Sequence, residues 1–261
     1  MKNGPSIDKT RLELLYSRYN HRDFVHPDPI EFLYDFKELH DREIVALIAS
    51  SLAYGRVTQI LKSVSRVLQR MGPSPHRFLL NTPWDRLQSS FSRFRHRFTS
   101  GEELSSLLGG AKRAIERYGS LRQCFLAGYQ DQDETVLPAL SAFVRALDFE
   151  NNGRLRTYIP SPDRGSACKR LNLFLRWMVR EDEVDPGGWR LVPVSKLVVP
   201  LDTHMHRIGL MLNLTKRRQP DMRAAMEMTA AFRCMAPEDP VRYDFVLTRF
   251  GIRNDLDRAA L

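Results

Sequence analysis

The sequence has little cysteine and no long apolar run. Its only three cysteines, Cys124, Cys168 and Cys234, lie far apart in a chain of 261 residues. This spacing excludes a disulfide framework and a CxxC metal pair, and it indicates a reducing, cytoplasmic setting. No apolar run approaches about 18 residues, so we predict no membrane span. The N-terminal stretch MKNGPSIDKTRLELLYSRYN also lacks the apolar core of a signal peptide.

The sequence also lacks alternating strand patterns and internal repeats. Apolar residues recur at helical spacing instead, most clearly between residues 41 and 71, where a break at Gly55 separates two periodic runs. The runs consist of Ile44, Leu47 and Ile48, and then Ile60, Val64, Val67 and Leu68. We therefore predict an all-α protein with about ten to twelve helices.

Basic residues outnumber acidic ones. Lys plus Arg is 40 and Asp plus Glu is 31, which gives a net charge of +9 and a pI near 9.7. The excess is clustered, as in Ser92–Phe98 (SRFRHRF), which favours a polyanionic partner such as nucleic acid over a merely soluble basic protein. We expect this segment to form a helix with phenylalanines inside and arginines outside, with or without phosphate contacts.

The stretch Leu191–Leu214 carries the most informative acidic residue. An apolar run, residues 197–201, leads to Asp202 at the start of a helix, and Ile208, Met211, Leu212 and Leu214 continue at helical spacing. Asp is a preferred N-cap, because its carboxylate accepts hydrogen bonds from unpaired backbone N–H groups. Capping alone explains the residue, and a functional carboxylate is the alternative.

A second informative segment precedes it. Residues 158–166 contain two prolines, Gly165 and Ser166, the expected N-cap of a helix from about 167 to 180 with Lys169 near its start. The buried stripe of this helix should be Leu171, Phe174, Leu175 and Met178. A loop containing Pro186-Gly187-Gly188 and Trp189 then leads to the Asp202 stretch.

Taken together, these segments resemble the helix-hairpin-helix base-excision DNA glycosylases of the endonuclease III superfamily. In that family a Val-Asp-Thr-His-like segment, here Leu201-Asp202-Thr203-His204, carries the catalytic aspartate. Bifunctional members place a lysine near the start of the second hairpin helix, as Lys169 stands here. The separation of 202 − 169 = 33 residues is similar to that of the archaeal 8-oxoguanine glycosylase branch.

The resemblance is strongest over Ile159–Leu214 and Ile44–Leu68. There the segments KRLNLFLRWMVR and PLDTHMHR also resemble an uncharacterised bacterial family, long called a domain of unknown function. The usual Leu-Pro-Gly-Val-Gly hairpin is altered to Ile-Pro-Ser-Pro-Asp-Arg-Gly at residues 159–165, so only the first proline and a later glycine match.

The resemblance implies a two-lobed helical fold. Residues 45–165 would form a central lobe ending in the hairpin, and residues 1–44 with 166–261 would form the second. Lys169 and Asp202 would face duplex DNA in the cleft between them. The expected activity is excision of an oxidised, 8-oxoguanine-like base from damaged duplex DNA, with associated AP lyase nicking, by a monomer in the cytoplasm, nucleoid-associated if the source is bacterial.

The chemistry assigned to the pair is covalent catalysis. A lysine amine is a nucleophile only when neutral, a form that a desolvated site favours. It would attack C1′ of the deoxyribose, expel the base and form a Schiff base, and β-elimination would nick the strand. Asp202 would take the proton of the amine or stabilise positive charge on the sugar. Taken alone, Lys169 would be read as an ordinary solvated lysine.

Other residues are candidates for contacting DNA. A side chain must fill the gap that a flipped base leaves, and Tyr54 or Arg56 in the helix break would serve, unless this is an ordinary turn. Trp189 would stack on the base, although packing of its own loop explains it too. The full set of predicted DNA contacts is Tyr54, Gly55, Arg56, Gly165, Ser166, Arg170 and Arg207, with Trp189 and His204 as base-pocket candidates.

No metal or cofactor is predicted. Asp202, His204 and His206 suggest a ligand set, but residues two apart on a helix point about 200° away from each other. His206 is expected at the surface, and His204 is expected to hold the turn or to hydrogen-bond Asp202. Phe245–Gly251 is similar to the segment before an iron–sulfur loop, but no group of four cysteines follows it.

Two other function classes remain open. A non-enzymatic DNA-binding protein on the same scaffold would bind duplex with a steep salt dependence and would be indifferent to Asp202→Asn. A protein-interaction or RNA-processing role would use the basic surface alone.

Overall fold

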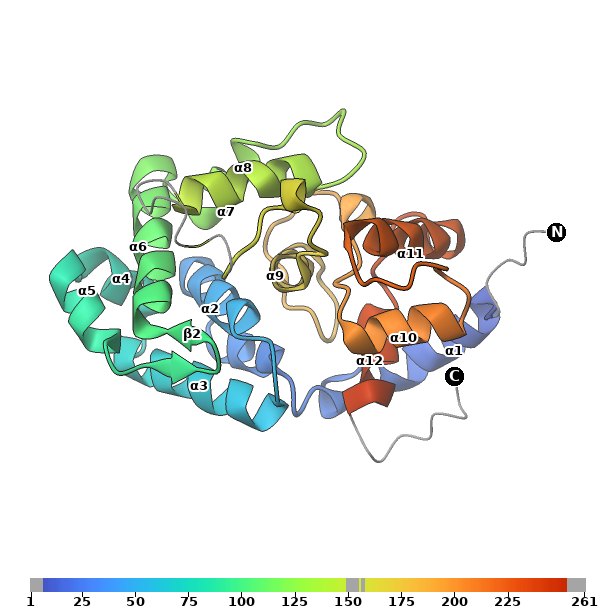
Figure 1. Ribbon diagram of the computed structural model, residues 1–261, viewed down its shortest axis with the longest axis horizontal. Coiled ribbons are helices and arrows are strands. Elements are labelled where there is room, and N and C mark those ends of the chain that lie inside the picture. Colours follow the sequence, from blue (N-terminus) through green and yellow to red (C-terminus); the bar gives the residue numbers. More distant parts are fainter. Residues whose placement is uncertain (1–6, 149–154, 156–157, 253–261) are drawn as a thin grey trace. The chain divides into compact units, whose positions relative to one another are not determined.

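Helices dominate the chain (Figure 1). A computed structural model describes residues 7–148, 155 and 158–252. Within these residues the chain forms twelve α-helices, four short 3-10 helices and one two-stranded hairpin, which confirms the predicted all-α class. None of the described helices combines the length and the hydrophobicity that crossing a membrane requires.

Two units divide the chain. Unit 1 takes its described residues from Met1–His26, Glu134–Val136 and Gly165–Leu261, and unit 2 from Pro27–Asp133 and Leu137–Arg164. Unit 2 begins at Pro27, whereas the predicted central lobe began at residue 45, and its 3-10 helix η2 (Pro29–Asp35) packs on α2 (Leu39–Ser51). The second boundary between the units falls between residues 164 and 165, one residue from the predicted position after residue 165.

Unit 2 is built around α2, which is buried over most of its length. It contacts α3 (Val57–Met71), α4 (Pro75–Asn81) and α7 (Leu121–Leu126). The apolar periodicity predicted this core correctly, since every residue of the two runs is at most 8% exposed: Ile44, Leu47, Ile48, Ile60, Val64, Val67 and Leu68.

The longest helix of unit 2 is α6 (Gly101–Tyr118), which packs against α5 (Trp84–Phe91) and α8 (Leu137–Asp148). A capping box fixes its start, because Ser100 and Glu103 each accept a backbone hydrogen bond from the other. A Cβ atom at Gly110 would lie 2.1 Å from the Leu147 carbonyl oxygen, so only glycine permits this approach of α6 and α8. The 3-10 helix η3 (Pro162–Arg164) also packs on α8.

The basic segment Ser92–Phe98 does not form the predicted helix. It leaves α5 in a turn and enters β1 (Arg95–His96), which pairs antiparallel with β2 (Thr99–Ser100). Strand alternation places His96 inside, at 2% exposure, and Arg95 outside. The His96 side chain finds its hydrogen-bond partners elsewhere in unit 2, and these contacts favour the hairpin over a helix. No local sequence pattern indicates these partners.

Unit 1 contains the remaining elements. These are α1 (Lys9–Tyr19), η1 (Arg22–Phe24), α9 (Lys169–Val179), η4 (Val194–Lys196), α10 (Thr203–Met211), α11 (Met222–Met235) and α12 (Asp244–Ile252). Helix α12 contacts both α10 and α1. The predicted stripe of α9 is confirmed, since Leu171, Phe174, Leu175 and Met178 are at most 1% exposed.

One predicted apolar position of α10 is wrong. Met211 is 57% exposed, because the helix ends at this residue. Asn213 then takes a positive φ of 58°, which turns the chain away before Leu214.

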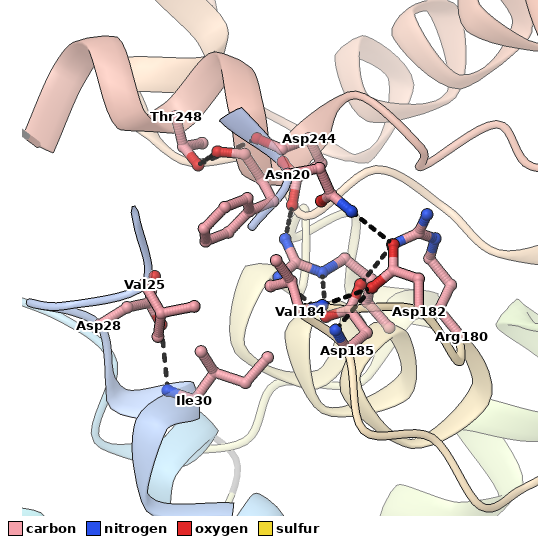
Figure 2. Close-up of polar contacts among 12 residues, drawn as sticks. Asn20, Val25, Asp28, Ile30, Arg180, Asp182, Val184, Asp185, Asp244 and Thr248 are labelled. Carbon is pink, nitrogen blue, oxygen red and sulfur yellow. Dashed lines mark hydrogen bonds and ion pairs between the residues drawn. The ribbon is translucent and has the colours of Figure 1, made fainter. Parts of the chain in front are cut away.

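Arg176 of α9 and Arg180, the residue at the C-cap of this helix, form a buried ion-pair cluster in unit 1. Arg176 donates hydrogen bonds to Asp185, in the loop after α9, and to Asp244, the first residue of α12. Figure 2 shows Asp182 and Asp185 near Arg180. Arg180 completes the cluster by pairing with these two carboxylates and with Asp239. The two arginines, Asp185 and Asp244 have side chains at most 4% exposed, so losing one partner would leave a buried charge uncompensated.

Helix α1 joins the same cluster. Tyr16 Oη and Asn20 Nδ2 each donate to an oxygen of Asp182 at 2.9 Å (Figure 2 labels Asn20). Just before α12, Tyr243 Oη donates to Glu13 Oε1 at 2.6 Å. Polar contacts therefore hold α1, α9 and the start of α12 together.

The cluster holds more acidic groups than cations, and this excess of negative charge helps to raise the pKa of Asp244. Burial raises its pKa to about 6, because desolvation and the carboxylates of Asp202 and Asp185 outweigh the attraction of Arg176. Folded Asp244 therefore takes up a proton at a pH where the unfolded chain, with a pKa near 3.8, does not. This group makes the fold more stable as the pH falls through that window.

We expect Asp244→Asn, which resembles the protonated acid, to change the pH dependence of stability. As the pH rises from about 4 to 7, wild type should lose roughly 1–3 kcal/mol of unfolding free energy relative to the variant. Urea unfolding at a series of pH values measures this difference. Asp85→Asn, which removes an exposed carboxylate of α5, is the control. A difference that grows in favour of wild type with rising pH would contradict the assignment.

Candidate active site

Lys169 is the first residue of α9. The residue before it, Cys168, is buried and has a φ of 47°, in the left-handed region that non-glycine residues rarely adopt. Ser166 is not the N-cap that the sequence predicts. Its Oγ instead accepts a hydrogen bond from the Cys168 N–H at 3.3 Å, within the turn that precedes the helix. This turn sets the point at which Lys169 leaves the backbone.

Asp202 is the N-cap of α10, as predicted. The apolar run before it is buried, and the Val199 N–H donates to Thr229 Oγ1 of α11 at 3.1 Å, which anchors the run. Asp202 Oδ1 accepts hydrogen bonds from the backbone N–H groups of His204 at 2.9 Å and Met205 at 2.8 Å. One carboxylate oxygen therefore does the capping.

The other oxygen meets the lysine. Lys169 Nζ lies 3.3 Å from Asp202 Oδ2, with the two side chains 29% and 21% exposed. The predicted proximity of the amine and the carboxylate is confirmed, although 33 residues separate them in the sequence. The sequence left open whether Asp202 only caps the helix or is a functional carboxylate. Asp202 caps α10 through Oδ1 and pairs with Lys169 through Oδ2.

The charge state of Asp202 follows from these contacts. Burial alone would raise its pKa, but the Lys169 ammonium and the Met205 N–H outweigh it and hold the pKa of Asp202 below the ordinary value of 3.8. Asp202 is therefore a carboxylate at neutral pH. Such a group can orient a cation or stabilise developing positive charge, and it is a weak proton acceptor.

The two histidines of α10 have different environments. His204 is exposed, and α12 passes close to it, since a Cβ atom at Gly251 would lie 3.1 Å from His204 Nδ1. His204 meets Asp202 through its backbone N–H, which fits the prediction that it holds the turn. His206 was expected at the surface but is 7% exposed, because its Nε2 donates to the Arg217 carbonyl oxygen at 2.8 Å.

Several predicted DNA contacts lie along the chain next to the pair. Arg170 follows Lys169 on α9 and is half-buried, and Arg207 lies on the exposed side of α10. Before α9, Gly165 is exposed with a φ of 76°, and Ser166 is half-buried. The Gly165 carbonyl oxygen accepts a hydrogen bond from the Met222 N–H at the start of α11, which ties the turn before α9 to that helix within unit 1.

Trp189 does not belong to the site. Its side chain is fully buried, and its ring packs edge-on against Phe174 of α9, with 5.2 Å between the ring centroids. Its backbone N–H donates to the Met178 carbonyl oxygen at 2.8 Å. The base-stacking hypothesis for Trp189 is therefore wrong, and packing of its own loop accounts for the residue.

The predicted DNA contacts at the helix break belong to unit 2. Tyr54 is half-buried and its hydroxyl donates to the His96 carbonyl oxygen at 2.8 Å, so it anchors the β1–β2 hairpin. Inserting Tyr54 into DNA would break this contact, which favours the alternative of an ordinary turn for this residue. Gly55 and Arg56 are exposed, and Gly55 has a φ of 95°.

The hairpin beside this break contains residues that the sequence did not single out. Arg97 and Phe98 form its two-residue tip, and Phe98 is 82% exposed. This segment has no hairpin signal such as Asn-Gly, so its pattern fitted a helix equally well. The interleaved arginines and phenylalanines were the available sign of an unusual surface.

No metal site is visible within residues 7–148, 155 and 158–252, where no three His, Cys, Asp or Glu residues cluster suitably. The Asp202, His204 and His206 set, which helical geometry argued against, does not gather around one point either, since the His206 ring nitrogen bonds Arg217.

Comparison with known proteins assigns a family. The model of DUF2400, described as a protein of unknown function, matches residues 28–253. The chain belongs to this family. Both Lys169 and Asp202 lie within the match. No curated protein and no solved structure matches the chain.

We expect Asp202→Ala and Asp202→Asn to separate the two roles of the carboxylate. Alanine removes the cap and the ion pair and should cost about 1–2 kcal/mol of unfolding free energy, whereas asparagine keeps a capping oxygen and should cost less than about 1 kcal/mol. Chemical denaturation measures both.

The pH dependence of the same variants has a defined sign. Because the folded pKa of Asp202 is lowered, its charge stabilises the fold above about pH 4, and this contribution disappears as the pH falls through the folded pKa. The advantage of wild type over Asp202→Asn should shrink below about pH 4. Equal losses for the two variants at neutral pH would contradict the division of the two oxygens.

Proposed function

We propose that this protein is a DNA glycosylase that removes an oxidised, 8-oxoguanine-like base from duplex DNA and nicks the strand by AP lyase chemistry. The observation that carries the proposal is the 3.3 Å approach of Lys169 Nζ to Asp202 Oδ2 in a partly exposed position. An amine and a carboxylate are the two groups that this reaction requires.

The reaction would proceed through the lysine. After losing a proton, Lys169 Nζ attacks C1′ of the damaged nucleotide, and the bond from C1′ to the base breaks with its electron pair leaving on the base, which takes up a proton. The resulting hemiaminal opens to a Schiff base as the amine loses a proton and O4′ takes one up. β-Elimination then removes a proton from C2′ and expels the 3′ phosphate. Each step transfers protons within the site or to water, so no cofactor is needed.

The role of Asp202 in this scheme follows from its contacts. A carboxylate with a lowered pKa is a poor store for a proton, so electrostatic stabilisation of the positively charged sugar outweighs general-base catalysis. The two backbone N–H donors on Oδ1 hold the group in place, which leaves Oδ2 directed at the reacting amine. DNA covering the pair would exclude water and strengthen the effect.

The charge of the protein supports a DNA substrate. A net charge of +9 favours a polyanionic ligand, and exposed Arg207 lies five residues after Asp202 on the same helix. An arginine near a reacting sugar is suited to neutralise a flanking phosphate, which positions the duplex without reading its sequence.

We expect borohydride to trap a covalent complex between wild type and a duplex that contains an oxidised purine. Lys169→Ala should abolish trapping, because the amine that forms the Schiff base is gone. Asp202→Asn should slow base release at least about 100-fold, the scale of a lost electrostatic contact in a transition state. Denaturing gel electrophoresis of labelled oligonucleotides, screened over several lesions, measures both.

Lys62→Ala, which removes an exposed lysine of α3, is the matched control and should trap as wild type does. Failure of wild type to trap or release any tested lesion would reject the proposal. Duplex binding that persists without turnover and ignores Asp202→Asn would favour the non-catalytic DNA-binding alternative.

We also expect Arg207→Gln to weaken binding to any duplex sequence. The loss of one phosphate contact should reduce the slope of log affinity against log salt concentration by about 1. Fluorescence anisotropy at several salt concentrations gives the slope. Arg70→Gln, at the exposed end of α3, serves as control, and an unchanged slope for Arg207→Gln would remove this residue from the interface.

A further inference from the structure

The tip of the β1–β2 hairpin presents an aromatic ring to solvent. Register fixes His96 opposite Thr99, so Arg97 and Phe98 are the two central residues of the turn. Phe98 is 82% exposed, the highest value among the large hydrophobic residues that the structure describes. A phenyl ring in this position contributes nothing to the core and is accessible to a ligand.

The base of the hairpin is rigidly held. Tyr54 Oη donates to the His96 carbonyl oxygen at 2.8 Å and accepts from the Thr99 N–H at 3.1 Å, so it bridges both strands. His96 Nε2 lies 3.0 Å from the Tyr54 carbonyl oxygen and must donate to it. Nδ1 then accepts from Ser63 Oγ of α3 at 2.9 Å. These hydrogen bonds hold the two strands in place, so the position of Phe98 at the tip is well defined.

Arginines lie before and within the hairpin tip in the sequence, and one of them contacts the Phe98 ring. The segment 92–100 contains three arginines, Arg93, Arg95 and Arg97, and no acidic residue, and all three are exposed. The guanidinium carbon of Arg97 lies 5.5 Å from the centroid of the Phe98 ring. A Cβ atom at Gly55 would lie 2.5 Å from Arg97 Cδ, so the turn that carries Gly55 and exposed Arg56 lies against the tip.

The backbone at the tip is strained at Arg97, a position where glycine would avoid the strain. Arg97 has a φ of 52°, and glycine or asparagine normally takes the first central position of such a turn. Glycine would relieve the strain but would remove the cation. An arginine held in this conformation is therefore a sign of function at the tip.

We propose that the Arg97–Phe98 tip is a DNA-binding element. Phe98 stacks on an unpaired or unstacked base, while Arg56, Arg95 and Arg97 contact the flanking phosphates. An aromatic face accepts any base, and the cluster of positive charge without an acidic residue matches a phosphodiester backbone better than a protein surface. The proposal adds a contact in unit 2 and does not require that Lys169 and Asp202 excise a base.

The test compares two undamaged duplexes that differ by one extrahelical nucleotide. Full-length wild type should bind the bulged duplex more tightly than the matched one. Phe98→Ala should weaken binding to the bulged duplex about tenfold, the size of one lost base–aromatic stack, and binding to the matched duplex less than twofold. Phe98→Tyr should retain the preference, because it keeps a ring. Anisotropy titrations at fixed salt give the affinities.

A second variant tests the cation. Arg97→Gly should weaken binding to both duplexes and reduce the salt slope, while its melting temperature is equal to or above that of wild type, because the strained φ is relieved. A purely structural role for Arg97 would instead lower the melting temperature. Arg70→Gln is the matched control. Arg56 caps the N-terminus of α3, and Arg70 lies on the same helix roughly 21 Å from Arg56 along the axis.

Equal affinities of Phe98→Ala and wild type for the bulged duplex, or equal losses on both duplexes, would overturn the proposal. A preference seen only with a bulged RNA duplex would overturn the assignment to DNA. Because no substrate here carries a lesion, failure of excision leaves the proposal standing, and failure of the hairpin to bind leaves borohydride trapping unaffected.

Discussion

The buried contact between Arg176 and Asp244 is the constraint on which the candidate site depends. Arg176 lies seven residues after Lys169 on the same helix, about 10 Å along its axis. Asp244 begins α12, which packs on α10, the helix that Asp202 caps. The geometry of the Lys169–Asp202 pair is therefore set from the opposite end of α9, where both partners of the ion pair are inaccessible to water.

The carboxylates of the two regions also influence each other. Negative charge on Asp202 contributes to the raised pKa of Asp244, so the buried proton and the candidate site are coupled. Lys169 opposes this effect by pairing with Asp202, and a ligand that separated the two would leave the Asp202 charge more strongly felt. Binding of such a ligand would then favour protonation of Asp244, because both act on the same local charge balance.

Much of unit 1 and the core of unit 2 follow from local patterns in the sequence. Period and capping are local properties, so the stripe of α9 and the N-cap at Asp202 could be read directly. The approach of Lys169 to Asp202 could be anticipated only through family resemblance. The burial of Trp189 and His206, and the hairpin at Arg97, depend on partners distant in sequence, such as Phe174, Arg217 and Tyr54. No local pattern reveals such partners.

The order of the segments in unit 1 has a consequence for how the chain acquires its structure. Helix α1 is synthesised first, yet its partners around α12 follow some 230 residues later, as the contact of Glu13 with Tyr243 shows. Unit 2 has all its segments by residue 164 and can form while the ribosome is still translating. Closing so long a loop is slow, so we expect α1 to dock on the rest of unit 1 last, after the much shorter segment between Lys169 and Asp202 has closed.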